Sequence, residues 1–144
     1  MLASVTRLRV RSPLYLPAFL WETFRSRRQA VRAPGFLGGR LLVDAGRTFW
    51  TLTAWEGERD MRAFRGAGAH AKVMPRLAGW CTEASYAHWT SEDLPSWEQA
   101  YEYLLREGRL SRVAHPSADH EARRFPKPRL TPLIELNLKP QTKH

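Results

Sequence analysis

Two neighbouring stretches of the chain show the two-residue periodicity of β-strands. Apolar and polar residues alternate over residues 36–43, and a second, more apolar run follows over residues 48–55. Residues 44–47 between them include Gly46, which can adopt a positive φ, so the two runs predict a hairpin. Because the second run is apolar on both of its faces, we expect a central strand that is covered on both sides.

The other patterns predict two more strands and several helices. The strands are expected over residues 6–10 and 82–89. Apolar residues recur every three to four positions in four segments, residues 16–32, 58–65, 69–80 and 97–107. Pro75 falls inside the third of these, so a kink is expected there. The order of elements up to residue 89 is βαββαβ, which is the order of a ferredoxin-like α+β fold.

The helix expected over residues 16–32 has a mixed composition. Its apolar positions are predicted to face the core, namely Leu16, Phe19, Leu20, Phe24, Ala30 and Val31. Arg25, Arg28 and Arg32 lie on its other side. The pattern therefore predicts a helix that packs its apolar face on the sheet and leaves a basic face in solvent.

The chain divides into a folded domain and a tail. Residues 1–108 are predicted to form the ferredoxin-like domain with the helix of residues 97–107 appended, and Ser96 can cap that helix. Residues 109–144 are rich in Pro and Arg and contain five of the ten prolines. We expect an extended tail along the surface. Its apolar residues are also compatible with a strand or with contact to a partner subunit, namely Leu133, Ile134, Leu136 and Leu138.

Composition limits the class of protein. A chain of 144 residues has material for one domain with a real core. Its single cysteine, Cys81, excludes an intramolecular disulfide, and no signal-peptide pattern opens the sequence. We therefore expect a reduced, cytoplasmic protein. No apolar run approaches the roughly 20 residues that a membrane-spanning helix needs.

The net charge is +9 and the isoelectric point is about 10.6. Such a charge is compatible with nucleic acid, anionic lipid or an anionic ligand. The basic residues are nevertheless spread along the chain, and no nucleic-acid-binding motif is present. Nucleic acid is therefore not the expected partner.

Three side chains are candidates for proton transfer or metal binding. His70 follows a glycine-rich turn and opens a predicted helix, so its imidazole could bind iron or act as a base, or simply cap the helix. Tyr86 and His88 alternate on one strand and could hydrogen-bond a substrate, although the pattern favours a structural role for the histidine. His115 and His120 lie in the tail with no third ligand nearby, which argues against a metal site there.

Other candidates could bind a ligand without reacting. Arg9 and Arg40 lie on the strand faces opposite the leucines and valines, where they could bind a carboxylate or a haem propionate, or be solvated. Trp55 and Phe64 could line a pocket or fill the core. Cys81 lacks a neighbouring base, and no glycine-rich phosphate or dinucleotide loop is present, so nucleophilic and nucleotide-dependent chemistry find no support.

Several of these residues also carry a family resemblance. The segment Pro34-Gly35-Phe36, the run from Phe49 to Glu56, and Met61, Phe64 and His70 together resemble the dimeric α+β barrel superfamily, which contains the antibiotic-biosynthesis-type monooxygenases. A second set resembles the spheroidene-monooxygenase-like proteins, namely Gly68-Ala69-His70, Met74-Pro75, Trp80-Cys81 and His88-Trp89.

The resemblance implies a homodimer in which two sheets face one another and each subunit encloses a pocket between sheet and helices. An isolated sheet of this kind would also leave one apolar face, including Phe49 or Trp50, open to water. The resemblance further implies a monooxygenase-like protein that acts on a hydrophobic or aromatic small molecule. Haem with His70 as its ligand and the absence of any cofactor are equally compatible with it. The alternative is a non-catalytic dimeric module that binds a small molecule.

Overall fold

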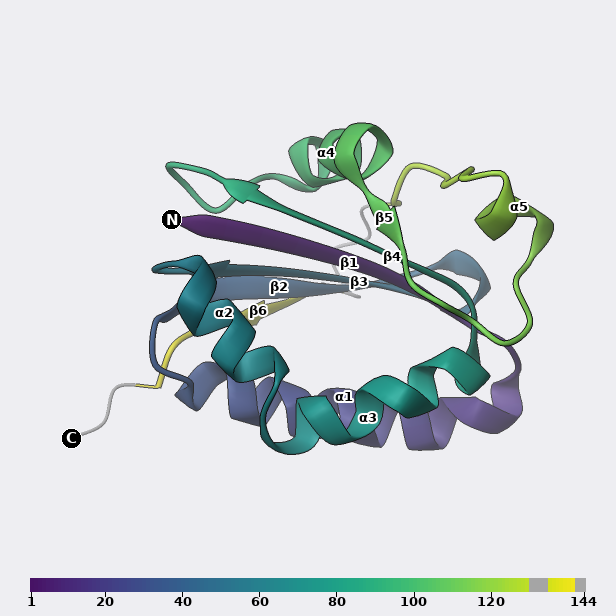
Figure 1. Cartoon of the computed structure of the whole chain (residues 1–144), viewed down its shortest axis with the longest axis horizontal. Helices are drawn as coiled ribbons and strands as arrows, with labels where there is room; N and C mark the ends of the chain where they lie inside the picture. The colour runs from purple at the N-terminus through teal and green to yellow at the C-terminus, as the bar shows by residue number, and fades with distance from the viewer. Residues whose placement is uncertain (130–134, 142–144) are drawn as a thin grey trace.

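The computed structural model describes residues 1–129 and 135–141 and has an antiparallel six-stranded sheet with helices on both faces (Figure 1). The strands are β1 (Leu2–Val10), β2 (Phe36–Asp44), β3 (Thr48–Trp55), β4 (Cys81–Thr90), β5 (Arg109–Leu110) and β6 (Glu135–Leu138). The helices are α1 (Leu16–Arg32), α2 (Glu58–Arg65), α3 (Gly68–Trp80), α4 (Trp97–Glu107) and α5 (Ala118–Glu121). The strands are ordered β5-β4-β1-β3-β2-β6. The predicted ferredoxin-like α+β fold is confirmed.

Most element boundaries follow the sequence patterns. The hairpin turn contains Gly46 at φ 66°, as expected, and Ser96 forms a capping box with Gln99 at the start of α4. β1 begins at Leu2, four residues earlier than predicted, because Ala3 and Val5 continue the buried alternation. Pro75 lies inside α3, which continues through it as one helix from Gly68 to Trp80.

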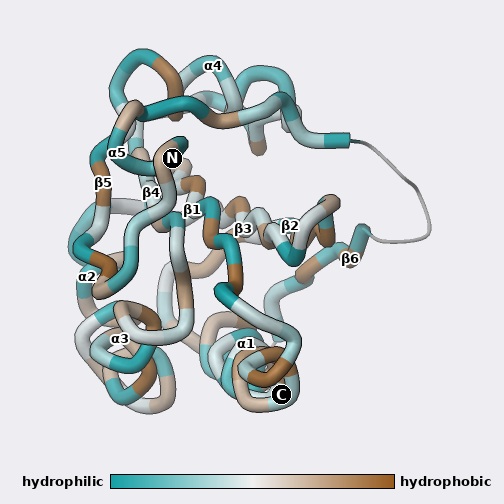
Figure 2. Tube along the Cα trace, turned by 90° about the vertical axis from the view of Figure 1, so that its right-hand side faces the viewer, coloured by the Kyte–Doolittle hydropathy of each residue, from teal (hydrophilic) through white to brown (hydrophobic). Residues whose placement is uncertain are grey.

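Helices cover both faces of the sheet. α1, α2 and α3 lie against one face, and α4 lies against the other (Figures 1 and 2). The α4 face holds a core that includes Val5, Trp50 and Leu52 of the sheet with Trp97 and Leu104 of α4. Trp50, Leu52 and Leu104 have no solvent exposure. β3 is thus a central strand, as predicted.

The sheet face that was expected to be open to water in a monomer is covered within this chain. Trp50 is fully buried, because α4 and Phe125 pack on its face of the sheet. Phe49 is partly buried on the other face and packs on Phe19 of α1, with ring centroids 4.7 Å apart. The C-terminal part of the chain thus covers the sheet face that holds Trp50, and no second subunit is needed to bury that face.

The tail is more closely built into the domain than predicted. β5 pairs with β4 and β6 pairs with β2, so the tail adds a strand at each edge of the sheet. Between them, Val113 and Phe125 are buried, and the hydroxyl of Tyr101 donates to the carbonyl of Phe125 at 2.7 Å. Leu136 and Leu138 belong to β6, whereas Leu133 and Ile134 lie outside the described residues.

One helix face is also predicted incorrectly. Leu20 and Phe24 of α1, expected in the core, are exposed, whereas Phe19, Ala30 and Val31 are buried. The apolar positions of α1 extend around more of the helix than the sheet can cover. Among the described residues, none of the helices has the length and apolar character to cross a membrane.

Candidate functional site

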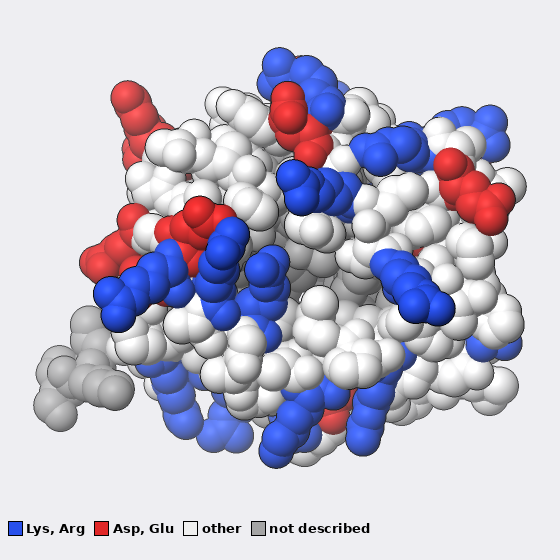
Figure 3. All heavy atoms as spheres, viewed as in Figure 1, with Lys and Arg blue, Asp and Glu red and all other residues white. Residues whose placement is uncertain are grey.

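The sheet face that lies beneath α1 to α3 has a polar centre. It is formed by side chains of the three central strands that share this face, namely Ser4, Thr6, Thr51, Thr53 and Tyr86. All five are partly exposed, whereas Val5 and Leu52 on the opposite face are fully buried. Central strands keep such exposure only where the covering layer does not close on them. Figure 3 shows a hollow in the middle of the molecule on this side, with Lys and Arg side chains around it.

An aromatic ladder borders this cleft. Trp55 is fully buried, and its indole Nε1 donates to Thr53 Oγ1 at 3.0 Å. Phe64 of α2 stacks on Trp55 with ring centroids 5.0 Å apart, and the His70 ring lies 4.7 Å from Phe64. The three predicted residues are therefore brought together. Only Phe64 and His70 retain exposure, so Trp55 supports the pocket rather than lining it.

The imidazole of His70 is held in one tautomer. Its Nδ1 lies 3.2 Å from the backbone carbonyl oxygen of Arg65, which can only accept a hydrogen bond. Nδ1 of the neutral ring must therefore carry the proton, which leaves the lone pair on Nε2. Burial lowers the pKa of His70 below its ordinary value, and this effect outweighs the opposing one of the Arg65 carbonyl. His70 is thus a neutral base or ligand at neutral pH.

Gln29 of α1 positions the helix that carries His70. Its Oε1 accepts from the backbone N–H of His70 at 2.9 Å, and its Nε2 donates to the carbonyls of Phe64 and Ala67 at 3.0 and 2.7 Å. One side chain thus ties α1 to the α2–α3 turn. No sequence pattern indicates this role of Gln29, because a glutamine on a helix is usually a solvated residue.

Tyr86 and His88 share one face of β4, as predicted, and it is the face that borders the cleft. Tyr86 is partly buried and lies directly opposite Thr6 in the register of β4 and β1. His88 is exposed at the rim, with its Nε2 3.9 Å from a carboxylate oxygen of Glu58 on α2. Tyr86 is therefore a partly exposed residue on the cleft face of the sheet, and His88 lies at the rim beside α2.

Arg9 and Arg40 do not belong to this cleft, and the expectation that they share a site with His70 is wrong. Both project to the α4 face of the sheet. Arg9 donates to Glu83 at 3.1 Å and to the Gly46 carbonyl at 3.2 Å. Arg40 lies 3.9 Å from Glu135. The alternation of the strands was predicted correctly, but the helices that enclose the cleft cover the other face.

A buried polar cluster on the α4 face was also missed. Glu83 has no exposure and accepts from Arg7 at 3.0 Å and from Arg9 at 3.1 Å. The Arg7 guanidinium lies between the rings of Trp50 and Phe125, 5.7 and 5.4 Å from their centroids. His120 of α5 accepts at Nδ1 from the Ala84 N–H at 3.3 Å. Buried charges need partners of this kind, so the cluster fastens the C-terminal part to the sheet.

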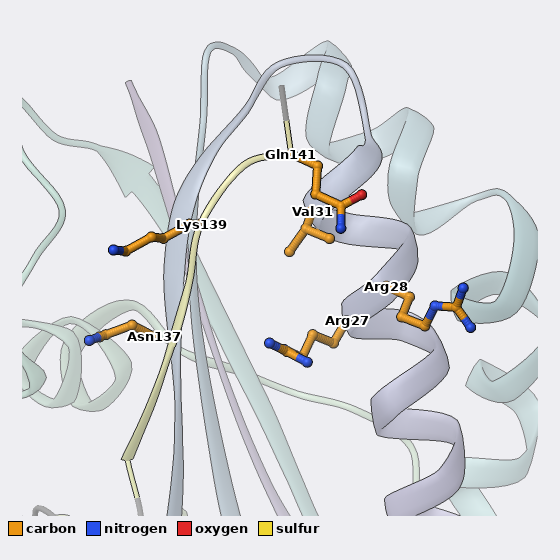
Figure 4. A pocket seen from close by; sticks show the side chains of 6 residues that line it. All are labelled: Arg27, Arg28, Val31, Asn137, Lys139 and Gln141. Carbon is orange, nitrogen blue, oxygen red and sulfur yellow. The ribbon is translucent and has the colours of Figure 1, made fainter. Parts of the chain in front are cut away.

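A second hollow lies between α1 and the edge strand β6, with a volume of about 270 Å³ (Figure 4). Its walls are Arg27, Arg28, Val31, Asn137, Lys139 and Gln141. Arg27 and Val31 point from α1 toward β6, whereas Arg28 points away (Figure 4). Within the described part of the chain, the buried Nε of Arg27 has no hydrogen-bond acceptor. This groove is suited to a small anion.

Two further observations concern clusters of metal-binding side chains and the thiol of Cys81. The described residues contain no group of three His, Cys, Asp or Glu side chains that could hold a metal ion. Burial raises the pKa of Cys81 to about 12, so its thiol stays protonated at neutral pH and is a poor nucleophile.

Several solved structures have a fold similar to that of this chain. A protein from Nitrosomonas europaea described as an antibiotic biosynthesis monooxygenase is 19% identical, with a TM-score of 0.58 over 65% of this chain and 100% of that one. Rv0793 from Mycobacterium tuberculosis is 14% identical, with a TM-score of 0.58 over 66% of this chain and 98% of that one. SnoaB, a cofactor-independent oxygenase from Streptomyces nogalater, is 20% identical, with a TM-score of 0.53 over 66% of this chain and 97% of that one.

These likenesses show a shared ferredoxin-like fold. About a third of this chain has no counterpart in them, which is close to the share of the chain that follows β4. No family model matches the chain, and no curated protein matches it.

The cleft residues meet only part of what haem requires. The Nε2 lone pair of His70 could serve as an axial ligand, since Nδ1 is held by a carbonyl. The two arginines expected to hold the propionates, Arg9 and Arg40, are on the opposite face of the sheet. The residues therefore do not form the haem site that was expected from the sequence.

Proposed function

We propose that this chain is a monooxygenase-like enzyme that oxidises a phenolic aromatic molecule in the cleft between the sheet and α2–α3, without a cofactor. The observation that carries the proposal is His70. It is a neutral imidazole with its proton held on Nδ1 by the Arg65 carbonyl, and it packs on Phe64 at one end of the aromatic ladder. The fold shared with SnoaB supports the same conclusion.

The proposed reaction needs few catalytic groups from the protein. Oxidation of a phenol to a quinone by O₂ places one oxygen atom in the product and releases the other as water, so the substrate supplies all the electrons. The barrier falls when the phenol loses its proton first. His70 Nε2 is the group proposed to accept this proton, because a general base must be unprotonated at the working pH and Nε2 carries the free lone pair of the ring. Tyr86 and the threonine hydroxyls would donate to the resulting phenolate oxygen.

The surroundings of the cleft favour such a substrate. Phe64 and His70 keep partial exposure and give the cleft an aromatic border that an aromatic substrate could contact. The Lys and Arg side chains around the hollow favour an anion over a neutral molecule (Figure 3). The sequence resemblance to spheroidene-monooxygenase-like proteins supports an apolar substrate as well, and a haem-dependent variant of the reaction is the competing form of this proposal.

The experiment is oxygen uptake by the purified protein with a panel of phenols and hydroquinones, with and without added haem. We expect uptake without haem, and a loss of roughly 10²-fold or more in kcat for His70→Ala. His115→Ala, which changes an exposed histidine of the C-terminal part, is the control. Titration with haem, followed at the Soret band, tests the competing form. Saturable binding that is abolished by His70→Ala, together with activity only when haem is present, would replace the cofactor-free proposal.

The groove between α1 and β6 favours a second candidate function, a non-catalytic module that binds a small anion. The buried Nε of Arg27, which has no hydrogen-bond acceptor among the described residues, supports it. Calorimetric titration with phosphate and with citrate, compared between the natural chain and Arg27→Met, would test it. Saturable binding lost in Arg27→Met, with no oxygen uptake from any phenol, would favour the binding module.

We propose no dimer through the α4 face, because this chain covers that face itself. A homodimer remains a proposal for another surface, and sedimentation of the full chain at micromolar concentration tests it. A monomer there would exclude it.

A further inference from the structure

The outer side of α1 carries a cluster of apolar side chains that nothing in the described chain covers. Leu20, Trp21 and Phe24 are 49%, 60% and 43% exposed, and Leu14, just before the helix, is 86% exposed. Trp21 and Phe24 stack on one another with ring centroids 6.0 Å apart. Trp21 is a large, costly side chain to leave in water, and a contiguous exposed cluster of this kind marks an interaction surface.

Arginines continue the same side of the helix. Arg25, Arg28 and Arg32 are exposed in the turns that follow the apolar cluster. The guanidinium of Arg28 lies 5.9 Å from the centroid of the Phe24 ring, so the basic and apolar groups adjoin. The acidic residue within α1, Glu22, is buried and pairs with Arg25 at 3.3 Å. Figure 3 shows Lys and Arg side chains along the lower border of the molecule, over α1 and α3.

We propose that α1 docks this protein on the surface of an anionic lipid bilayer. The apolar cluster would enter the boundary between headgroups and acyl chains, and the arginines would contact the phosphates. Both the apolar cluster and the arginines then have partners, because the interface of an anionic bilayer places acyl chains next to phosphates. Nucleic acid would leave Leu14 and Leu20 without a partner, and a second copy of the chain would bring the same net charge of +9 to the contact.

The test is co-sedimentation of the full chain with vesicles of phosphatidylcholine alone and with vesicles that contain one quarter phosphatidylglycerol. We expect binding to the anionic vesicles and little binding to the neutral ones. Removing both cations in Arg25→Ala/Arg28→Ala should weaken the partition coefficient roughly thirtyfold, about fivefold for each charge. Trp21→Ala/Phe24→Ala should weaken it roughly tenfold or more.

Matched controls separate this surface from charge in general. Arg109→Ala/Arg112→Ala removes the same charge from exposed positions beyond α4, and Leu105→Ala shortens an apolar side chain of α4 with a similar exposure, 44%. Both should bind like the natural chain. All substituted positions are exposed, so circular dichroism should show every variant folded.

A second measurement reports insertion directly. Vesicles with brominated acyl chains should quench the tryptophan emission of the natural chain. The quenching should largely disappear in Trp21→Phe, which keeps an apolar side chain and should still sediment with the vesicles. The other described tryptophans are buried or partly buried and should contribute little.

Three results would overturn the proposal. They are no binding to anionic vesicles, binding that the Arg109→Ala/Arg112→Ala control weakens equally, or binding that is insensitive to Trp21→Ala/Phe24→Ala. Self-association of the natural chain in sedimentation, lost in Trp21→Ala/Phe24→Ala, would instead assign the surface to a second copy. None of these measurements involves oxygen uptake, so they test the docking surface independently of the proposed enzyme activity.

Discussion

The side chain of Gln29 accepts a hydrogen bond from the backbone N–H of His70 at 2.9 Å, although the two residues are 41 positions apart. The same amide donates to two carbonyls of the turn between α2 and α3. Gln29 also lies 3.1 Å from the place where a Cβ would be at Gly68, whose φ is +57°. The start of α3 is therefore shaped around this one glutamine.

Replacing Gln29 by Ala should loosen the start of α3. A hydrogen bond contributes about 0.5–1.5 kcal/mol net, and an unpaired group that stays accessible to water costs less than a buried one, so we expect the free energy of unfolding to fall by about 1–2 kcal/mol. Urea unfolding measures this fall. NMR titration of the His70 ring should at the same time show its pKa moving up toward the ordinary value, because the ring gains water.

The control is Arg28→Ala on the same helix, which shortens an exposed side chain and should change stability by less than about 0.5 kcal/mol. An unchanged His70 titration in Gln29→Ala would mean that packing against Phe64 and the Arg65 carbonyl suffices to hold the ring.

The longer strands and helices and the two faces of the strands could be predicted, because each of these elements shows its period locally, whereas the face of α1 could not. Tyr86 and His88 could be placed on one face of β4, and Arg9 and Arg40 on the opposite faces of their strands, from alternation alone. Which face encloses the cleft could not be predicted, because that depends on where α4 packs. The role of Gln29 and the pairing of Glu83 with Arg7 are contacts between residues distant in the chain, for which a single sequence has no periodic signal.

α4 should contribute strongly to stability because it covers the sheet face that holds Trp50. Leu104 is fully buried against this face, and truncating such a leucine to Ala costs roughly 2–5 kcal/mol. Leu105→Ala, at the next position and 44% exposed, should cost less than about 0.5 kcal/mol. Chemical denaturation of both variants measures the difference. Equal effects would show that α4 is only loosely attached.

Glu83 should be among the most sensitive charged residues of the chain. It has no exposure and forms ion pairs with Arg7, whose side chain is 4% exposed, and with Arg9, whose side chain is 38% exposed. Glu83→Gln leaves the Arg7 charge buried without its counter-charge, which costs roughly 3–5 kcal/mol. Glu58→Gln removes a carboxylate from the exposed pair with Arg62 and should cost less than about 1 kcal/mol.

Thermal and urea unfolding of Glu83→Gln and Glu58→Gln should therefore differ clearly. A small effect of Glu83→Gln would mean that water or a neighbouring acceptor replaces the carboxylate beside Arg7. Expression at low temperature keeps the comparison feasible if Glu83→Gln unfolds near body temperature.

The attachment of the C-terminal part should weaken in mild acid. Burial lowers the pKa of His120 below its ordinary value of 6.5, against the opposing effects of Glu83 and Glu121. The unfolded chain then takes up the proton at a higher pH than the folded chain. Stability from this group is complete above about pH 6.5 and is lost as the pH falls below it, by at most about 1.4 kcal/mol per pH unit. His70, whose pKa is also lowered, acts in the same direction.

His120→Asn isolates this contribution. An asparagine amide oxygen can take the place of Nδ1 as acceptor for the Ala84 N–H, and it does not titrate in this range. We expect the free energy of unfolding of the natural chain to fall between pH 7.5 and 5.5, and to fall less in His120→Asn. His115→Asn, at an exposed position five residues earlier, should keep the natural slope. If His120→Asn keeps it too, His120 does not couple the C-terminal part to pH, and the acid sensitivity belongs to His70.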